Sequence, residues 1–163
     1  MTSAQILEKM IVYSKGCQRD IEHLMRVWGF ARTIGCLEGL DESTLLTVET
    51  AAILHDIACP FLRAEMGYSP FDRQEELGAR LAKEFLSETD LPSAIQERVV
   101  FLVGHHHSPQ LIDGIDFRIL IEADYLVNCV SHGLDAEAAL AFEGHYFATE
   151  TGRKLLHSFL PEN

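Results

Sequence analysis

The stretch Leu45–Ile57, with the sequence LLTVETAAILHDI, is an apolar segment that closes on the doublet His55-Asp56. Residues three or four positions apart share one face of an α-helix. Here that face carries Leu45, Val48, Ala52 and His55. A globular protein does not bury an imidazole or a carboxylate without a partner, because each stranded charge costs several kcal/mol. The stretch therefore predicts a core helix whose C-terminal end carries a polar site.

Three further segments place one polar residue each on an apolar helical face. The faces are His23 with Val27, Phe30 and Ile34, then Asp124 with Phe117, Leu120, Ile121 and Val127, then His106 with Ile95, Val99 and Leu102. Neighbouring residues on a helix point about 100° apart, so His55 and Asp56 can reach one ion only near the end of their helix. If these faces meet, a divalent cation is the common partner that neutralises them at the lowest cost.

The hydrophobic period is helical almost throughout the 163 residues, and no strand-like alternation lasts more than a few residues. We predict one all-α domain over residues 1–163, a helical bundle with a buried metal site. The predicted helices cover 3–14, 19–37, 42–57, 73–87, 93–106, 116–131 and 135–159, the last with a break near Gly152. Asp41 is placed to cap the third helix. The segment Ala58–Asp72 contains two prolines and a glycine, and we predict an irregular loop there.

The charge balance limits the partners. The chain has 13 Lys and Arg against 25 Asp and Glu, a formal net charge of −12. This charge repels the phosphate backbone of nucleic acids and anionic membrane surfaces, so we expect neither a nucleic acid polymer nor a membrane as partner. A small phosphorylated substrate is still compatible, because a cation and a few basic groups can reverse the field inside a cleft.

Other features bear on location. No apolar run approaches the roughly 20 residues that a membrane span needs. The four cysteines form no C-x-x-C pair, and the N-terminal residues are typical of an amphipathic helix rather than a secretion signal. We therefore expect a cytoplasmic protein in a reducing environment. The sequence leaves open whether it forms a homodimer.

The predicted ligand set is His23, His55, Asp56 and Asp124. Two imidazoles and two carboxylates, with no thiolate, suit Mn, Fe, Co, Ni or Mg better than a closed structural zinc site. Four protein ligands leave an octahedral ion two positions for water and substrate, as a catalytic metal requires. We therefore expect a divalent metal ion as cofactor.

The order of these residues resembles the H…HD…D signature of the HD-domain metal-dependent phosphohydrolase superfamily. The stretch Asp20–Val27 (DIEHLMRV) is similar to the D-x-x-H-x-x-R-V stretch of small bacterial and archaeal members. Ala51–Ile57 (AAILHDI) resembles their A-x-L-L-H-D-I run, and Ile121–Leu126 (IEADYL) their A-D-x-L run. The matching segments extend from about residue 20 to 127. The resemblance implies a helical bundle of the HD-domain type.

The chain also departs from the family pattern. Many members carry a lysine shortly after the doublet, where this chain has Ile57-Ala58-Cys59. Many two-metal members place a histidine where this chain has Gln74, and glutamine is a poor ligand, so we expect one metal per chain. The triplet His105-His106-His107 partly offsets this, because members carry a histidine there as a second-metal or phosphate contact.

The resemblance implies a phosphohydrolase acting on a nucleotide-like or other small phosphorylated metabolite. The metal would polarise a phosphoryl oxygen and lower the pKa of a bound water. Asp56 would act with the metal, and His106 or His105 would bind phosphate or assist proton transfer. His106 alone fits a helix C-terminus equally well, since the macrodipole favours cationic groups there. Any of Arg19, Arg26 and Arg63 could neutralise phosphate charge.

Two other functions stay open. Similar helical scaffolds with two irons perform oxygenase chemistry, which needs a second cluster of ligands, and Gln74 argues against it. A non-catalytic metal-containing binding or sensor module is the other alternative. The sequence does not identify the substrate, because one scaffold of this kind serves many phosphorylated compounds.

Overall fold

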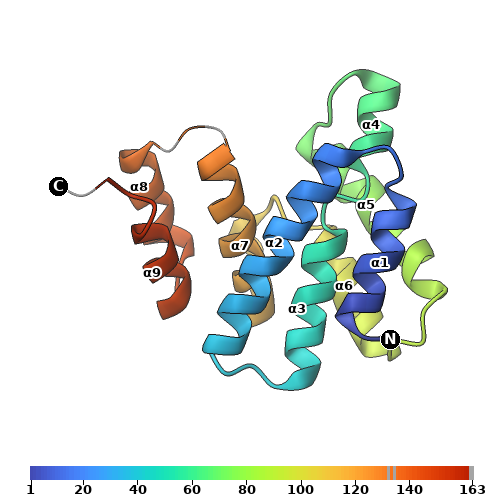
Figure 1. Cartoon of the computed structure of the whole chain (residues 1–163), viewed down its shortest axis with the longest axis horizontal. Coiled ribbons are helices and arrows are strands. Elements are labelled where there is room, and N and C mark those ends of the chain that lie inside the picture. The colour runs from blue at the N-terminus through green and yellow to red at the C-terminus, as the bar shows by residue number, and fades with distance from the viewer. Residues whose placement is uncertain (132, 134, 162–163) are drawn as a thin grey trace.

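The computed structural model describes residues 1–131, 133 and 135–161, and within them the protein is all-α, as predicted. Figure 1 shows α2 and α3 side by side in the middle of the molecule, with α8 and α9 at one end. In chain order the elements are α1 (Ser3–Tyr13), α2 (Gln18–Leu37), α3 (Glu42–Leu54), α4 (Cys59–Met66), α5 (Phe71–Ser87), α6 (Ser93–Val103), the 3-10 helix η1 (Pro109–Leu111), α7 (Ile115–Ser131), α8 (Ala136–Tyr146) and α9 (Glu150–His157).

The segment that was predicted to be an irregular loop, Ala58–Asp72, contains the short helix α4, so that prediction was wrong. Pro60 is the second residue of α4, where the missing N–H leaves no intrahelical hydrogen bond unmade. Gly67 ends the helix in the left-handed conformation, with φ 82°, which glycine adopts without steric cost. The prolines and the glycine thus mark the ends of a helix rather than its absence.

The predicted helix 135–159 is divided into α8 and α9, and the division lies at residues 147–149 rather than at Gly152. Phe147 has an extended backbone and is buried in the core. Thr149 begins α9 as its N-cap, where its side-chain oxygen accepts a hydrogen bond from the Gly152 N–H at 2.9 Å. A buried aromatic residue and a strong cap therefore outweigh the glycine in placing the break.

Helix α3 is the centre of the core and packs against α1, α2, α6 and α7. Every residue from Thr47 to Leu54 is buried, because neighbouring helices cover all sides of this segment. Asp41 caps the helix as predicted, and its carboxylate accepts hydrogen bonds from the backbone N–H groups of Ser43 and Thr44 at 3.0 and 3.1 Å. The buried helix delivers the residues that follow Leu54 to the interior of the protein.

The run Glu42–Met66 is the part of the described chain that is long and apolar enough to count as a candidate membrane span, with a mean hydropathy of 1.4. However, 72% of the apolar 18-residue window within this run is buried inside the fold. The core helix α3 accounts for most of this run, and a core helix of a soluble protein has the same composition. The run is therefore weak evidence for a membrane span.

Glu122 joins α7 to the C-terminal helices. Its side chain is buried and accepts hydrogen bonds from the backbone N–H groups of Ala148 and Thr149, at 2.8 and 3.1 Å, and from the Thr149 hydroxyl. Burial raises the pKa of Glu122 above its usual value, although these hydrogen bonds act in the opposite direction. The short connection before α9 is thus fixed to the core through one carboxylate.

Replacing Gly152 by alanine should destabilise the protein. An added Cβ would overlap the Glu122 carboxylate and would lie 2.6 Å from the Thr149 Oγ1. We expect the free energy of unfolding to fall by about 1–3 kcal/mol, as for other overpacked sites. Thermal unfolding would show this as a lower Tm, by roughly 2–4 °C per kcal/mol for a chain of this size.

The matched control is Gly144→Ala, because a Cβ at this exposed helical position meets nothing within 4 Å. Alanine favours the helix there, so the Tm should stay constant or rise slightly. Equal Tm values for the two variants would contradict the packing described around Glu122.

Candidate metal centre

Three different helices bring the four predicted ligands together. His23 lies in α2, and Asp124 lies in α7. His55 caps the C-terminal end of α3, and Asp56 follows it in the turn that leads to α4. The helical hydrogen-bonding pattern ends before the doublet, so these neighbours are free to aim at one point. The site lies at the end of the helix, where the sequence placed it.

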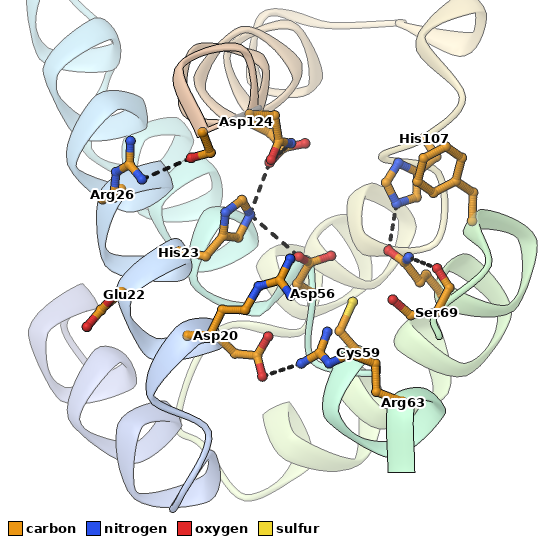
Figure 2. Close-up of a pocket in the computed structure, with 15 residues that line it drawn as sticks. Asp20, Glu22, His23, Arg26, Asp56, Cys59, Arg63, Ser69, His107 and Asp124 are labelled. Atoms are coloured by element: carbon orange, nitrogen blue, oxygen red, sulfur yellow. Dashed lines mark hydrogen bonds and ion pairs between the residues drawn. The ribbon is translucent and has the colours of Figure 1, made fainter. Parts of the chain in front are cut away.

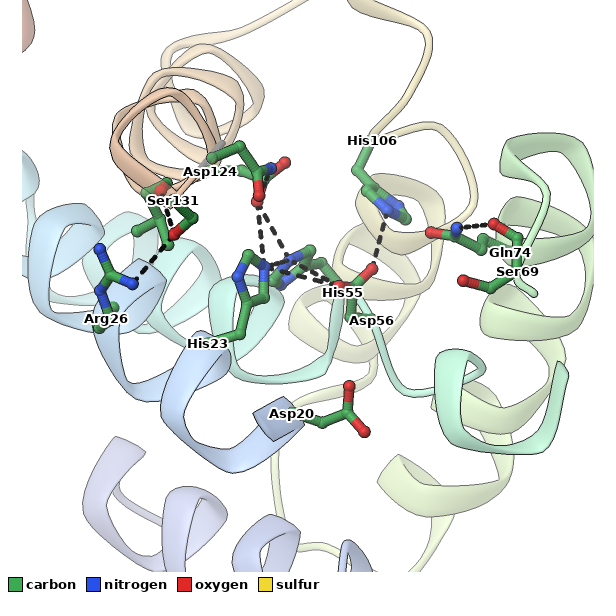
Figure 3. A network of polar contacts seen from close by, with 12 residues as sticks. Asp20, His23, Arg26, His55, Asp56, Ser69, Gln74, His106, Asp124 and Ser131 are labelled. Atoms are coloured by element: carbon green, nitrogen blue, oxygen red, sulfur yellow. Dashed lines mark hydrogen bonds and ion pairs between the residues drawn. The ribbon is translucent and has the colours of Figure 1, made fainter. Parts of the chain in front are cut away.

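The ligand atoms face one another across short distances. His23 Nε2 lies 3.1 Å from His55 Nε2, 3.2 Å from Asp124 Oδ1 and 3.5 Å from Asp56 Oδ2. His55 Nε2 lies 3.5 Å from Asp124 Oδ1 and 3.7 Å from Asp56 Oδ2. Figure 3 shows His23, His55, Asp56 and Asp124 pointing toward a common centre. Two imidazole nitrogens and two carboxylate oxygens therefore converge there.

The tautomer of His55 suits a metal ligand. Its Nδ1–H donates a hydrogen bond to the Ala52 carbonyl at 2.9 Å, which leaves the lone pair on Nε2 facing the centre. His55 is almost completely buried, and the side chains of His23 and Asp124 are only 20% and 16% exposed. This donor set and its orientation fit a divalent cation with nitrogen and oxygen ligands. His23, His55 and Asp56 together form a group whose ligand atoms all lie within 4.8 Å of one another.

The pKa shifts of the cluster indicate that its buried carboxylates are stabilised by positive charge. Burial tends to lower the pKa of His55, but the charge of Asp56 and the contact with Asp124 outweigh it and raise the pKa to about 9. Burial tends to raise the pKa of Asp124, but its hydrogen bonds with His23 and His55 hold it well below the usual range. In the absence of metal, a proton on His55 neutralises part of the carboxylate charge. A cation would replace that proton.

His106 lies against the other side of Asp56. Its Nε2 is 3.6 Å from Asp56 Oδ1, and its Nδ1–H donates to the Val103 carbonyl at 2.8 Å. The Nε2 atom is buried and makes no hydrogen bond within the described structure. Asp56, His106 and His107 form a second group whose ligand atoms all lie within 4.8 Å of one another. Asp56 is therefore placed between the two groups.

The histidine triplet divides into three environments. His106 is directed inward, as the helical period predicted, but His105 is turned away from the cluster. The His105 ring stacks on Phe101 at 4.4 Å between centroids, and its Nδ1 bonds to the Phe101 carbonyl at 2.7 Å. The structure thus does not bring His105 to the site, because the chain turns directly after α6 and its ring follows the side of that helix.

Instead of His105, His107 lines the cavity beside the cluster, which sequence reasoning did not single out. His107 Nε2 is hydrogen-bonded to Gln74 Oε1 at 2.7 Å, and the Gln74 amide donates in turn to the Ser69 carbonyl. Burial, together with the nearby His106, lowers the pKa of His107 to about 3, so this ring is neutral at physiological pH. The glutamine that stands in place of a ligand therefore has a defined function as the partner of His107.

The cluster opens into a cavity of about 750 Å³. Figure 2 shows Asp56, His23 and Asp124 on one side of it and His107 on another, with Arg26 and Arg63 at its edges. The cavity is lined by Arg19, Asp20, Glu22, His23, Arg26, Asp56, Cys59, Arg63, Ser69, Phe71, Gln74, His107, Asp124, Asn128 and Ser131. Its volume is in the range of small-molecule sites.

Three arginines line this cavity, and their partners differ. Arg63 pairs with Asp20, and Arg26 donates to the Ser131 hydroxyl at 3.1 Å. Arg19 is exposed and makes no hydrogen bond or ion pair within the described part of the chain. The same cavity is also lined by the carboxylates of Asp20, Glu22, Asp56 and Asp124, so the arginines reduce its negative charge, and a bound divalent ion would make the balance positive.

Comparison with known proteins agrees with this geometry. The model of the HD domain family matches residues 20–129, which include all four predicted ligands. Among solved structures, a predicted HD superfamily hydrolase from an uncultured Thermotogales bacterium matches with a TM-score of 0.66 and 25% sequence identity. The match covers 96% of this chain and 82% of that protein. No curated protein matches the chain.

Removing the carboxylate between the two groups should abolish metal binding. We expect Asp56→Ala to lower the bound divalent metal from about one ion per chain to near zero, because the centre loses a charged ligand. Metal analysis after dialysis measures this, and far-UV circular dichroism should show an unchanged helix content. Asp72→Ala, an exposed carboxylate outside the cluster, is the control and should keep its metal. Metal retained by Asp56→Ala would contradict the ligand assignment.

Metal binding should also depend on pH. The pKa of His55 in the metal-free protein is about 9, so a proton competes with the cation below that pH. Each unit of decrease in pH should weaken binding about tenfold per displaced proton. Titration calorimetry with Mn²⁺ from pH 6.5 to 8.5, in buffers of different ionisation enthalpy, would measure both the affinity and the released proton. An affinity that stays constant over this range would refute the proton competition.

Proposed function

The chain belongs to the HD domain family, and from this premise we propose that it is a metal-dependent phosphohydrolase acting on a small phosphorylated metabolite, nucleotide-like or otherwise. One observation carries the proposal. Two imidazoles and two carboxylates converge at the base of a cavity that three arginines also line. A cation site next to guanidinium groups suits a phosphorylated compound better than an uncharged one.

In this proposal His23, His55, Asp56 and Asp124 hold one divalent ion, with Mn, Fe, Co, Ni or Mg as the candidates. Such an ion supplies Lewis-acid polarisation of a phosphoryl oxygen and a water of lowered pKa. One ion rather than two is favoured by Gln74, which stands where two-metal members carry a histidine and whose Oε1 accepts a hydrogen bond from His107 Nε2 at 2.7 Å. Asn128 supports Asp124, whose Oδ1 accepts from the Asn128 amide at 2.9 Å.

The residues around the cluster have separate tasks in binding. Arg19, Arg26 and Arg63 neutralise the phosphate charge, and Arg19 has its whole fork of donors available. The resemblance implied a phosphate contact for His106. Its buried Nε2, which faces Asp56, instead favours a role in orienting that carboxylate. We assign His106 as a positioning residue for Asp56 and leave His105 out of the site.

A metal analysis combined with a phosphate-release screen tests the proposal. The purified protein, loaded with Mn²⁺ or Co²⁺, would be assayed against nucleotides and sugar phosphates. About one ion per chain with release of inorganic phosphate supports the proposal. Two irons with oxygen consumption would instead support an oxygenase, and tight metabolite binding without turnover under any metal would support a sensor module.

Among the arginines, Arg19 offers the sharpest prediction. Arg19→Ala should raise the KM for the phosphorylated substrate about tenfold or more, because a charge-assisted contact to the phosphate is lost. Arg19→Lys should restore part of the loss, since it keeps the charge but not the bidentate geometry. Steady-state kinetics at fixed metal concentration would measure both.

Arg80→Ala is the matched control for this prediction. Arg80 is an exposed arginine outside the cavity, and it faces Glu84 on the same helix at 3.8 Å. The KM of Arg80→Ala should equal that of the wild type. Arg80→Ala and Arg19→Ala should both bind as much metal as the wild type. An unchanged KM in Arg19→Ala would remove Arg19 from the substrate site.

A further inference from the structure

Phe71 is an exposed aromatic residue at the edge of the metal cavity. It is the first residue of α5, it lines the cavity, and it is 66% exposed. One face of its ring stacks on His107, with 4.1 Å between the ring centroids and 28° between the planes. Single exposed apolar side chains are normal on a protein surface, so it is the place of this ring in the cavity lining that sets it apart. Its exposed surface is available to a ligand in the cavity.

The stacked pair is held in place before any ligand arrives. The His107 ring is bonded to Gln74, and the His107 backbone N–H donates to Glu75 Oε1 at 3.0 Å. The Ser108 hydroxyl donates to the same carboxylate at 3.0 Å. Two side chains from the first turns of α5 are thus hydrogen-bonded to the segment that carries His107. A rigid aromatic surface of this kind loses little conformational entropy when a flat ring stacks on it.

The position of this pair relative to the cluster matches the two ends of one ligand. One ring nitrogen of His107 lies within 4.8 Å of the possible ligand atoms of Asp56 and His106. The Phe71 ring stacks on the His107 ring. Asp56, Arg19 and Phe71 all line the same cavity, so a phosphate bound near Asp56 and Arg19 would share that cavity with the Phe71 ring. The cavity therefore combines a site for charge with a site for a planar ring.

We propose that Phe71, backed by His107, is a stacking platform for a planar ring of the substrate, so that the substrate class is a nucleoside monophosphate rather than a sugar or polyol phosphate without a planar ring. The proposal rests on the proposed function for the location of the phosphate. It adds a specificity-determining residue outside the metal ligands. Stacking tolerates any base, because every base has a π-face, so the platform selects for a ring and not for one base.

The test compares two phosphorylated probes, one with a planar base and one without. Adenosine 5′-monophosphate and ribose 5-phosphate would be titrated into Mn²⁺-loaded protein, and the half-saturating concentration would be taken from kinetics where phosphate is released and from calorimetry where it is not. The wild type should favour the nucleotide. Phe71→Ala should raise its half-saturating concentration roughly tenfold or more, the usual effect of losing one stacked base. The value for ribose 5-phosphate should stay constant.

Two further variants separate stacking from a general loss of packing. Phe71→Trp keeps an aromatic surface and should restore nucleotide binding. Tyr68→Ala is the matched control, because Tyr68 is 61% exposed on the same connection but does not line the cavity. It should behave as the wild type with both probes. With diamagnetic Mg²⁺ in place of Mn²⁺, upfield shifts of the adenine protons on binding, lost in Phe71→Ala, would give a direct signature of the stack.

The outcomes distinguish this inference from the proposed function. Equal half-saturation by the two probes in the wild type, or equal changes for both in Phe71→Ala, overturns the platform even if phosphate is released. Failure of the wild type to bind the nucleotide also overturns it. Ring-dependent binding that is lost in Phe71→Ala, without any release of phosphate, supports the platform and overturns the hydrolase.

Discussion

Two carboxylates and two imidazoles share a small volume at the end of a buried helix, and they can stay there only if a positive charge joins them. Asp56 and Asp124 would repel each other in a region that solvates charge poorly. Without metal, a proton on His55 meets part of this need, and the pKa of about 9 is its signature. A divalent cation meets it more fully, because it can contact both carboxylates and both imidazoles at once. The helices that surround the cluster therefore have one common requirement, which is to deliver these four side chains to the same point.

The fold meets this requirement by ending α3 one residue before the doublet. In a continuing helix, His55 and Asp56 would point about 100° apart. The turn at residues 55–58 removes that restriction, and α4 begins directly after it at Cys59. Because α4 follows so closely, Arg63 comes to the edge of the same cavity and pairs with Asp20 from α2. The short helix α4, which sequence reasoning treated as a connection, thus follows the candidate metal ligands directly and contributes Arg63 to the edge of the cavity.

Helical periodicity was enough to predict the fold class and the burial of α3, and it placed His23, His55 and Asp124 as polar residues in apolar stripes. Asp56 was predicted to join them only because it follows His55 near the end of the helix. Periodicity was not enough for residues in turns. Sequence reasoning preferred His105 to His107 as the second histidine of the site, and only the path of the chain after Val103 decides that His107 faces the cavity. Phe71 carried no signal either, since its importance depends on the ring of His107, 36 positions away along the chain. The position of α4 was missed because proline and glycine mark helix ends as often as loops.

The negative charge of the chain and the proposed phosphate site are compatible because the charges are separated in space. Most acidic side chains lie on the outer faces of the helices, where water screens them over roughly 8–10 Å at physiological ionic strength. Within the cavity, a divalent ion would offset Asp56 and Asp124, and Arg63 already offsets Asp20. Arg19 and Arg26 then stand against Glu22, the remaining carboxylate of the lining, so the charge of the cavity becomes positive once the ion is bound. The local balance at the cavity, rather than the total of −12, decides whether an anion can enter. A phosphate ester with a planar ring would make two favourable contacts in this cavity. Its phosphate would contact the ion and the arginines, and its uncharged ring would stack on Phe71.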